Sequence, residues 1–357
     1  MSLIKITCLF FLTVLVSNVS AQSDFVIRPN AYTAYKTQDA ITIDGKPDEL
    51  VWDSIEWSSD FIDIEGVKTP KYQTNVKIVW DDTYFYILAK IEEPHVWADI
   101  TQHDAVIFHN NDFEVFIDPD GDTHNYYELE INALNTVWDL FITKPYRELN
   151  SPVLNDWHIT GLKSAVHIDG TLNDASDTDK GWTLEMAIPW SVYKTSYYQD
   201  VVPRDTFWRV NFSRVNWDYE LTDGVYSRKK DLKGAFLHEY NWVWSPQGVV
   251  NMHEPEKWGY VYFSSSQAGT ETPFEIPKDE DIKWALYKMY SAQKAYFSKT
   301  NQWLTSIESI QSTPVILYGK TLYPTIENYS DGWIITLKSP FTNRLLSITE
   351  DGKFKIK

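Results

Sequence analysis

The stretch DFEVFIDPDGDTHNYYELEIN (112–132) has the pattern of two β-strands joined by a tight turn. Apolar and polar residues alternate along its first arm, and the same alternation returns in its second arm. Between the arms lies Asp-Pro-Asp-Gly-Asp, which favours a turn because Pro fixes φ and Gly accepts a positive φ. The segment is therefore predicted to be an antiparallel hairpin with one apolar face and one polar face.

Similar alternating stretches occur along most of the chain, from about Tyr32 to Phe263. Helical spacing is scarce in this region, and turn residues separate the stretches at short intervals. Many short strands of this kind predict an all-β fold, an antiparallel β-sandwich. The clearest further stretches are 76–80, 85–91, 182–188 and 208–212.

The pattern changes near the end of the chain. Ile282, Leu286 and Met289 recur at helical spacing, and strand-like runs follow them. We therefore predict a small α+β C-terminal domain, with one helix and short antiparallel strands. The predicted organisation is a signal peptide (1–21), the β-sandwich (22–264), a linker (265–277) and this C-terminal domain (278–357).

Residues 1–21 resemble a secretory signal peptide. Lys5 supplies the positive start, an apolar stretch follows, and Val19-Ser20-Ala21 predicts cleavage after Ala21. The expected location is secreted or periplasmic, and an uncleaved anchor is the alternative. The only cysteine, Cys8, lies in this segment, so after cleavage no thiol remains for a disulfide, a metal ligand or a nucleophile.

The composition limits the classes of ligand. The chain has 32 Lys and Arg against 50 Asp and Glu, a net charge of −18, which repels nucleic acid. An acidic protein suits neutral ligands and divalent cations better. Aromatic residues make up 15% of the chain, and their rings both fill protein cores and stack on the apolar faces of sugars.

The polar face of the 112–132 hairpin is the first candidate site. Alternation places Glu114 and Glu130 on this face, and Arg214 on a later strand is expected to join them. Carboxylates accept and guanidinium donates, so the three groups suit the hydroxyls of a sugar. A solvated sheet face with ordinary ion pairs is the alternative.

The turn of the hairpin is a candidate metal site. Asp118, Asp120 and Asp122 alternate like the oxygen ligands of a calcium loop. An EF-hand is excluded because its sixth position requires Gly, and Thr123 stands there. Another kind of calcium loop and a plain turn both remain open.

Catalytic motifs are mostly absent from the sequence. It contains no His-Glu-x-x-His zinc signature, no Gly-x-Ser-x-Gly elbow and no phosphate-binding glycine-rich loop. Glycoside hydrolysis needs two carboxyl groups, which Glu114 could supply together with Glu128 or Glu130. We therefore predict a non-catalytic binding protein, with a glycoside hydrolase as the alternative.

The order of these motifs resembles the family 9 carbohydrate-binding modules and their DOMON-like relatives. This resemblance implies a β-sandwich that holds a poly- or oligosaccharide, classically at chain ends, and structural calcium ions. The matching blocks are ITIDGKPDELVW (41–52), VKIVWDDTYFYI (76–87), DFEVFIDPDGDTHNYYELEIN (112–132), GWTLEMAIPW (181–190), WRVNFSRVNW (208–217) and the segment from NWVWSPQG to PEKWGYVYF (241–263).

The resemblance also implies roles for individual residues. Glu114 falls where the family has a sugar-binding carboxylate, and Glu130 and Arg214 fall where it has polar contacts to the ligand. The family clamps its ligand between two Trp side chains, but the aligned positions here are near Phe108-His109 and Met252. A different aromatic platform is therefore expected, with Trp138, Trp217 and Trp244 as the candidates, beside Trp97 and Trp242.

Some DOMON-like relatives hold haem b, and here Met252 with His253 or His109 would be the axial ligands. A Met or His on a strand is far more often a packing residue, so calcium is the expected cofactor and haem the alternative. The prediction is an exported, non-catalytic protein that acts in polysaccharide recognition or degradation. Its alternatives are haem binding, a hydrolase-associated module with weak activity of its own, and a structural protein whose C-terminal domain contacts a partner.

Overall fold

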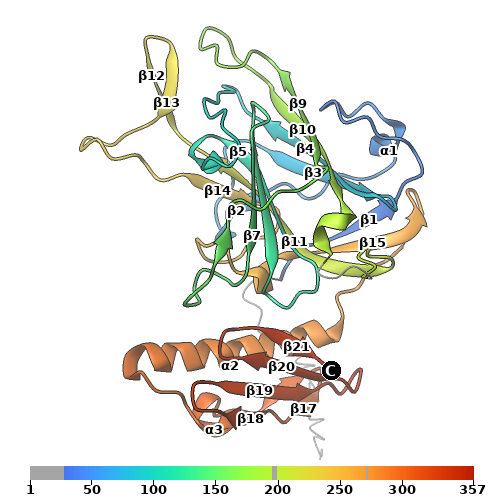
Figure 1. Ribbon diagram of the computed structural model, residues 1–357, viewed down its shortest axis with the longest axis vertical. Helices are drawn as coiled ribbons and strands as arrows, with labels where there is room; N and C mark the ends of the chain where they lie inside the picture. Colours follow the sequence, from blue (N-terminus) through green and yellow to red (C-terminus); the bar gives the residue numbers. More distant parts are fainter. Residues whose placement is uncertain (1–27, 195–198, 271) are drawn as a thin grey trace, which may run out of the picture.

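The computed structural model describes residues 28–194, 199–270 and 272–357. The predicted signal peptide, residues 1–21, lies outside the described residues. Figure 1 shows a large β body above a smaller body that contains the C-terminus. No helix in the described part of the chain is both long enough and apolar enough to span a bilayer.

Among the described residues, thirteen strands form one hydrogen-bonded sheet. One half of the sheet contains β8 (Val153–Leu154), β7 (Val137–Ile142), β6 (Tyr126–Asn132), β5 (Asp112–Asp118) and β11 (Thr206–Asn216). The other half contains β1 (Ala31–Lys36), β3 (Thr74–Trp80), β4 (Tyr84–Glu92), β10 (Gly181–Pro189) and β9 (Lys163–Asp169). β15 (Gly259–Gln267) joins the halves, and β14 (Tyr240–Val243) links β11 to β2 (Ile62–Asp63).

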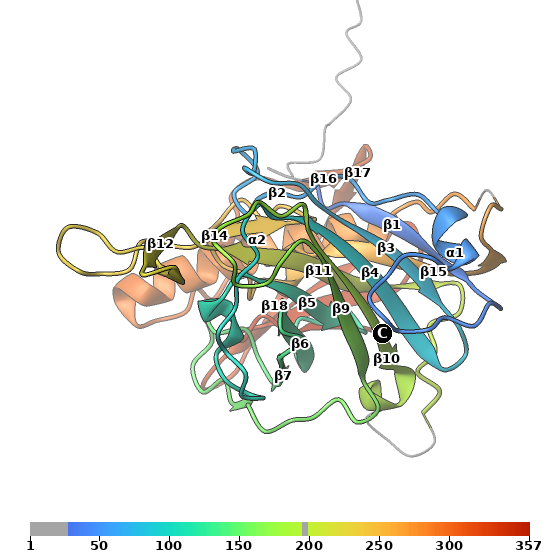
Figure 2. The ribbon, with the colours of Figure 1, turned by 90° about the horizontal axis from the view of Figure 1, so that it is seen from above.

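The two halves enclose the main core, which confirms the predicted β-sandwich. Alternation points Val76, Ile78 and Trp80 from one half, and Phe113 and Val115 from the other, into the same apolar cluster. Figure 2 shows β4, β9 and β10 lying beside β5, β6 and β7 when the molecule is seen from above. One detail differs from the prediction, because β1 pairs in parallel with both β15 and β3.

Close packing fixes at least one glycine of the sandwich. A Cβ atom at Gly259 would lie 2.3 Å from the ring of Trp244, which is far inside van der Waals contact. The Trp244 ring is buried against Phe212, with ring centroids 5.7 Å apart, so it has no space to move away.

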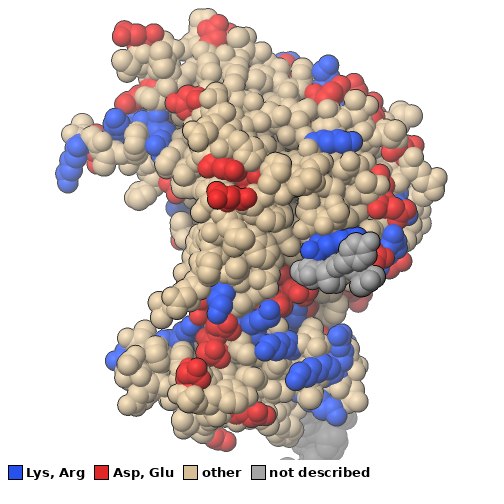
Figure 3. Space-filling view, in the orientation of Figure 1, with Lys and Arg blue, Asp and Glu red and all other residues tan. Residues whose placement is uncertain are grey.

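The remaining elements of this body lie outside the main sheet. β12 (Tyr219–Thr222) and β13 (Val225–Arg228) form a hairpin that projects from the sandwich in Figure 1. Lys and Arg side chains gather near this hairpin and on the C-terminal domain in Figure 3. The short helical elements are α1 (Leu50–Asp53), η1 (Ile107–His109), η2 (Trp190–Tyr193) and η3 (Pro255–Lys257).

The C-terminal body consists of a long helix on a small antiparallel sheet, as predicted. Ile282, Leu286 and Met289 of the helix pack against Ile335 and Ile348 of the sheet. Its helices are α2 (Lys278–Thr300) and α3 (Ile307–Ile310). Its strands are β16 (Val315–Leu317), β17 (Lys320–Leu322), β18 (Thr325–Asn328), β19 (Trp333–Lys338), β20 (Leu345–Thr349) and β21 (Phe354–Ile356).

The C-terminal body docks on the turn between β5 and β6. The Phe354 amide donates to the Asp122 carbonyl (3.0 Å), and the Thr123 hydroxyl donates to the Gly352 carbonyl (2.9 Å). Next to this turn, Arg209 of β11 pairs with Glu280 of α2 at 3.4 Å, and both side chains are buried. The interface between the β-sandwich and the C-terminal body therefore contains a buried ion pair, with one residue from each body.

Replacing Glu280 with Ala should leave the buried Arg209 guanidinium without its carboxylate. Breaking a buried ion pair on one side costs about 3–5 kcal/mol. We expect the free energy of unfolding, measured by urea denaturation, to fall by about that amount. Glu308→Ala, at an exposed position of α3, is the control and should change stability by less than about 0.5 kcal/mol. Equal urea midpoints for the two variants would contradict this account.

Candidate functional site

Four carboxylates lie together on one face of the β5–β6 hairpin. Asp112 and Glu114 come from β5, and Glu128 and Glu130 come from β6; we call these four residues the acid cluster. Glu114 is directly opposite Glu130 in the strand register, so their side chains point the same way. Carboxylate oxygens of Asp112, Glu114 and Glu130 all lie within 4.8 Å of one another. Glu114 and Glu130 therefore lie side by side, as the sequence predicts.

The acid cluster is almost sealed from solvent. Glu114 is 4% exposed and Glu130 is 2% exposed. The neighbouring strands extend the same face, because Ser213 of β11 is opposite Glu114 and Trp138 of β7 is opposite Glu130. Polar groups from four adjacent strands, β11, β5, β6 and β7, therefore lie together on one buried face of the sheet.

Several buried polar atoms on this face of the sheet lack a hydrogen-bond partner among the described residues. They are Asp112 Oδ2, Glu114 Oε2, Glu128 Oε2, Trp138 Nε1 and Ser213 Oγ. Buried polar groups in folded proteins are nearly always hydrogen-bonded, since an unbonded one loses its hydration without compensation. A concentration of unbonded donors and acceptors on one face is typical of a place that receives a polar ligand.

Burial also changes the ionisation of the acid cluster. Burial raises the pKa of Glu114 to about 7. The pKa values of Asp112, Glu128 and Glu130 are likewise raised by burial and then by the charges of neighbouring carboxylates. With a pKa of about 7, Glu114 is present both protonated and ionised at neutral pH, and a protonated carboxyl both donates and accepts hydrogen bonds.

Ring side chains lie around the acid cluster, and we call them the aromatic rim: Phe108, Trp138, Tyr146 and His253, with His109 against Phe108. The Phe108 amide donates to Glu130 Oε2 at 2.9 Å, and its ring stacks on Trp138 with centroids 6.5 Å apart. Tyr146 is 48% exposed, and its ring lies 3.8 Å from the His253 ring. Burial raises the pKa of Tyr146, and the nearby charges of Glu128 and Glu130 raise it further.

The expectation that Arg214 lies beside Glu114 and Glu130 is wrong. Ser213 is the residue opposite Glu114, so Arg214 points to the other face of the sheet. There the guanidinium is 0% exposed, lies 3.5 Å from Glu93 Oε2 and donates to the Glu92 carbonyl at 2.7 Å. Arg214 is held in the protein interior on the other face of the sheet from Glu114 and Glu130, although its charge is near enough to oppose the burial that raises the pKa of Asp112.

The three candidate Trp residues occupy different places. Trp138 belongs to the aromatic rim, whereas Trp217 is buried and donates from Nε1 to the Phe108 carbonyl at 2.8 Å. Trp217 thus contacts the aromatic rim through the backbone of Phe108. Trp244 does not reach the acid cluster, because it lies on the core side with Phe212.

Met252 lies on the same side of the sheet as the acid cluster but inside a second apolar cluster with Phe116 and Trp258. Its sulfur accepts a hydrogen bond from Gln247 Nε2 at 3.2 Å. His253 Nδ1 lies 3.0 Å from the Tyr126 hydroxyl, and burial lowers the pKa of His253 to about 3. These contacts describe packing residues, and they give haem ligation no support.

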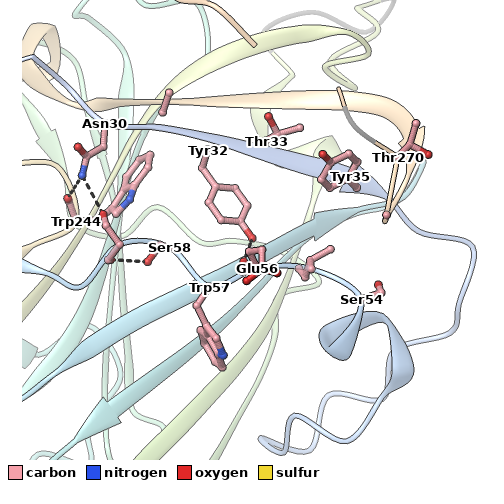
Figure 4. Close-up of a pocket in the computed structure, with 14 residues that line it drawn as sticks. Asn30, Tyr32, Thr33, Tyr35, Ser54, Glu56, Trp57, Ser58, Trp244 and Thr270 are labelled. Atoms are coloured by element: carbon pink, nitrogen blue, oxygen red, sulfur yellow. Dashed lines mark hydrogen bonds between the residues drawn. The ribbon is translucent and has the colours of Figure 1, made fainter. Parts of the chain in front are cut away.

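An open concavity lies elsewhere on the sandwich, between β1 and residues 54–59. It has a volume of about 580 Å³ and is drawn in Figure 4, where the Tyr32 hydroxyl points at Glu56 and Trp57 lies nearby. Its polar groups already bond to one another: the Tyr32 hydroxyl donates to the Glu56 carbonyl (2.8 Å), and Asn30 Nδ2 donates to the Trp244 carbonyl (2.6 Å). The unbonded atoms of the acid cluster therefore make it the stronger candidate site.

At the turn predicted to bind a metal, the aspartates already have partners within the protein. Asp118 accepts from the amides of Gly121 (3.0 Å) and Thr123 (2.9 Å), and Lys353 lies 2.9 Å from Asp122 Oδ2. The carboxylate oxygens of Asp118, Asp120 and Asp122 also lie within 4.8 Å of one another, a donor set that suits a hard cation. Burial raises the pKa of Asp118, and the charges of Asp120 and Asp122 raise it further. Calcium at this turn stays a prediction.

Sequence reasoning missed two members of the site. Ser213 would have been found if the register between β5 and β11 had been known, because Ser213 is one residue before Arg214 in the chain. Tyr146 lies in the loop after β7, and no periodicity of the sequence marks it.

Because the pKa of Glu114 is raised in the folded protein, the free energy of unfolding should decrease as the pH rises. Its usual pKa is 4.5 and its folded value is about 7, so the folded protein holds a proton that the unfolded chain releases between these values. Stability should fall as pH rises from about 4.5 to about 7. Glu114→Gln removes this titration and should stabilise the protein at pH 8 by about 3 kcal/mol, measured by urea denaturation.

The matched control for this titration is Glu308→Gln, at an exposed position. Its stability should follow the wild-type pH profile. A Glu114→Gln variant that is less stable than the wild type at pH 8 would show that the ionised carboxylate is stabilising, against the present account.

A crystal structure of a candidate carbohydrate-binding protein from Bacteroides uniformis ATCC 8492 is 18% identical over 66% of this chain and all of that chain, with a TM-score of 0.48. Two structures of a family 9 carbohydrate-binding module from Caldicellulosiruptor kristjanssonii, with cellotriose and with glucose, are each 14% identical. They cover 69% and 68% of this chain and all of their own, with TM-scores of 0.42.

No curated protein matches the sequence. The family model described as "Carbohydrate family 9 binding domain-like" matches residues 43–261, which is more than half of the chain and includes every member of the acid cluster. The chain therefore belongs to the carbohydrate family 9 binding domain-like family.

Proposed function

We propose that this protein binds a poly- or oligosaccharide at the acid cluster, beneath the aromatic rim, and does not hydrolyse it. The observation that carries the proposal is the group of unbonded buried atoms on β5, β6, β7 and β11. Membership in the carbohydrate family 9 binding domain-like family supports a sugar as the class of ligand.

The chemistry of the site suits a neutral, hydroxyl-rich molecule. Sugar hydroxyls donate to a carboxylate and accept from a protonated carboxyl, and the cluster offers both forms at neutral pH. The rings of Phe108, Trp138 and Tyr146 can cover the apolar face of a sugar ring. Because Glu114 and Glu130 are nearly sealed, binding at the cluster requires that side chains of the rim move aside to admit the ligand.

The arrangement of the carboxylates on a single sheet face supports binding without hydrolysis. A retaining glycosidase holds its two carboxyl groups about 5–5.5 Å apart, and an inverting one holds them farther apart, so that the groups flank the scissile bond. In the acid cluster, oxygens of Asp112, Glu114 and Glu130 lie within 4.8 Å of one another on a single sheet face. Because all four carboxylates of the cluster project from the same face of one hairpin, none of them stands across a bound sugar from the others.

The setting that we propose is outside the cytoplasm. The apolar stretch of residues 6–16, followed by Val19-Ser20-Ala21, supports export with cleavage after Ala21. An exported protein that binds a poly- or oligosaccharide would act in the recognition or degradation of polysaccharides.

Binding can be tested by calorimetry with glucose and with cello- and xylo-oligosaccharides. We expect Glu130→Gln and Trp138→Ala each to weaken binding at least about tenfold, which corresponds to about 1.4 kcal/mol. The control is Asp169→Asn. Asp169 lies on β9 and forms an exposed ion pair with Lys180, and this variant should bind like the wild type.

The same sugars also test the absence of hydrolysis, when they are incubated with the wild type and assayed for new reducing ends. Sugar release that Glu114→Gln abolishes would make the protein a glycoside hydrolase. Flat titrations with all of these sugars would overturn the binding proposal.

We further propose that Asp118, Asp120 and Asp122 hold a structural calcium ion. Binding to the folded state alone stabilises it, by about 2.7 kcal/mol at a calcium concentration one hundred times Kd. We expect calcium to raise the Tm of the chelator-treated wild type, and Asp120→Asn to remove most of this shift. A Tm that is the same with calcium and with chelator would leave Lys353 as the counter-ion of this turn.

A further inference from the structure

Two histidines and a buried aspartate meet at the edge of the sandwich. His103 lies in the segment between β4 and η1, Asp139 on β7, and His158 between β8 and β9. Each residue offers one ligand atom, and these three atoms lie within 4.8 Å of one another. The two imidazole centroids are 5.4 Å apart.

This trio is separate from the acid cluster. Trp138 shares a face with Glu130, so alternation points the next residue, Asp139, to the other face of the sheet. Asp139 is directly opposite Leu129, a member of the main core. The trio thus lies where the core side of the sheet meets two loops.

Asp139 presents an unbonded oxygen, Oδ1, to the His103 imidazole, and its other oxygen, Oδ2, faces the His158 imidazole. Its side chain is 0% exposed; Oδ2 accepts a hydrogen bond from the Ile159 amide, and Oδ1 has no hydrogen-bond partner among the described residues. The side chains of His103 and His158 are 47% and 62% exposed. An ion could therefore reach this carboxylate from solvent, between the two rings.

The separations fit ligands of one metal ion better than hydrogen bonds. His103 Nε2 lies 3.6 Å from Asp139 Oδ1, and His158 Nδ1 lies 3.5 Å from Asp139 Oδ2. Good hydrogen bonds are shorter, at about 2.7–3.2 Å. Metal bonds of about 2.0–2.2 Å in a tetrahedral zinc site place adjacent ligand atoms about 3.3–3.5 Å apart.

A second carboxylate orients one of the imidazoles. His103 Nδ1 lies 2.9 Å from Asp104 Oδ1, so a proton on Nδ1 would face this carboxylate and leave the Nε2 lone pair for a metal ion. Metal-binding histidines are commonly oriented in this way by a carboxylate on the opposite ring nitrogen. The backbone at Asp104 has a φ of 61°, and the Asp104 amide donates to the Val137 carbonyl at 3.1 Å, which fixes this segment to β7.

We propose that His103, Asp139 and His158 bind a divalent transition metal, for which zinc is the best fit. Two imidazoles and one carboxylate are ligands that zinc prefers, whereas calcium prefers oxygen ligands alone. The ion would tie the segments that carry His103 and His158 to β7. Water would occupy the fourth position, on the exposed side.

The test uses tag-free, chelator-treated full-length protein, because a histidine tag binds the same metals. We expect calorimetry with zinc chloride to detect one site, and cobalt(II) to give the intense visible absorption of a tetrahedral site. His158→Ala and His103→Ala should weaken zinc binding more than about 100-fold. His167→Ala, at an exposed histidine of β9, is the matched control and should bind like the wild type.

A second variant tests the orienting carboxylate. Asp104→Ala should weaken zinc binding by about 10- to 100-fold, because it frees the His103 ring without removing a ligand. Zinc should also raise the Tm of the wild type and of His167→Ala, but not of His158→Ala. Zinc binding that is unchanged in a His103→Ala/His158→Ala double variant would overturn the proposal. So would the absence of zinc binding by the wild type, which would reduce the trio to a His–Asp ion pair.

Discussion

The site depends on one register: Glu114 of β5 stands directly opposite both Glu130 of β6 and Ser213 of β11. Strand alternation then sends Phe113 and Val115 into the core and the carboxylates to the other face. The same register sends Arg214 into the interior, where it pairs with Glu93. A shift of one residue would exchange these faces, with carboxylates in the core and apolar side chains at the site.

Burying four carboxylates on one face is unfavourable for folding, because burial and mutual repulsion raise their pKa values. The large aromatic and aliphatic core between the two halves of the sheet must offset this cost. The unbonded oxygens of Glu114 and Glu128 then remain available to a ligand instead of being bonded within the protein. Such a conflict between stability and local structure is common at functional sites.

The C-terminal domain is connected to the same hairpin. Its Lys353 pairs with Asp122 at the turn, and Glu280 of α2 pairs with Arg209 of β11, which stands opposite Asp118 at the turn end of β5. One end of the hairpin thus docks on the C-terminal domain, and its other end carries Asp112 and Glu114. The C-terminal domain therefore contacts β11 and the β5–β6 turn, which belong to the strands that form the site.

The sequence by itself determined the strands, the hairpin and the meeting of Glu114 with Glu130, because alternation and a tight turn are local properties of the chain. Only the tertiary structure decided the rest. The pairing of β5 with β11, which joins Ser213 to the cluster and excludes Arg214, connects residues about one hundred positions apart, and no local pattern reports such a register. The sealing of the carboxylates, the aromatic rim and the trio of His103, Asp139 and His158 likewise depend on loops, whose paths are set by packing rather than by periodicity.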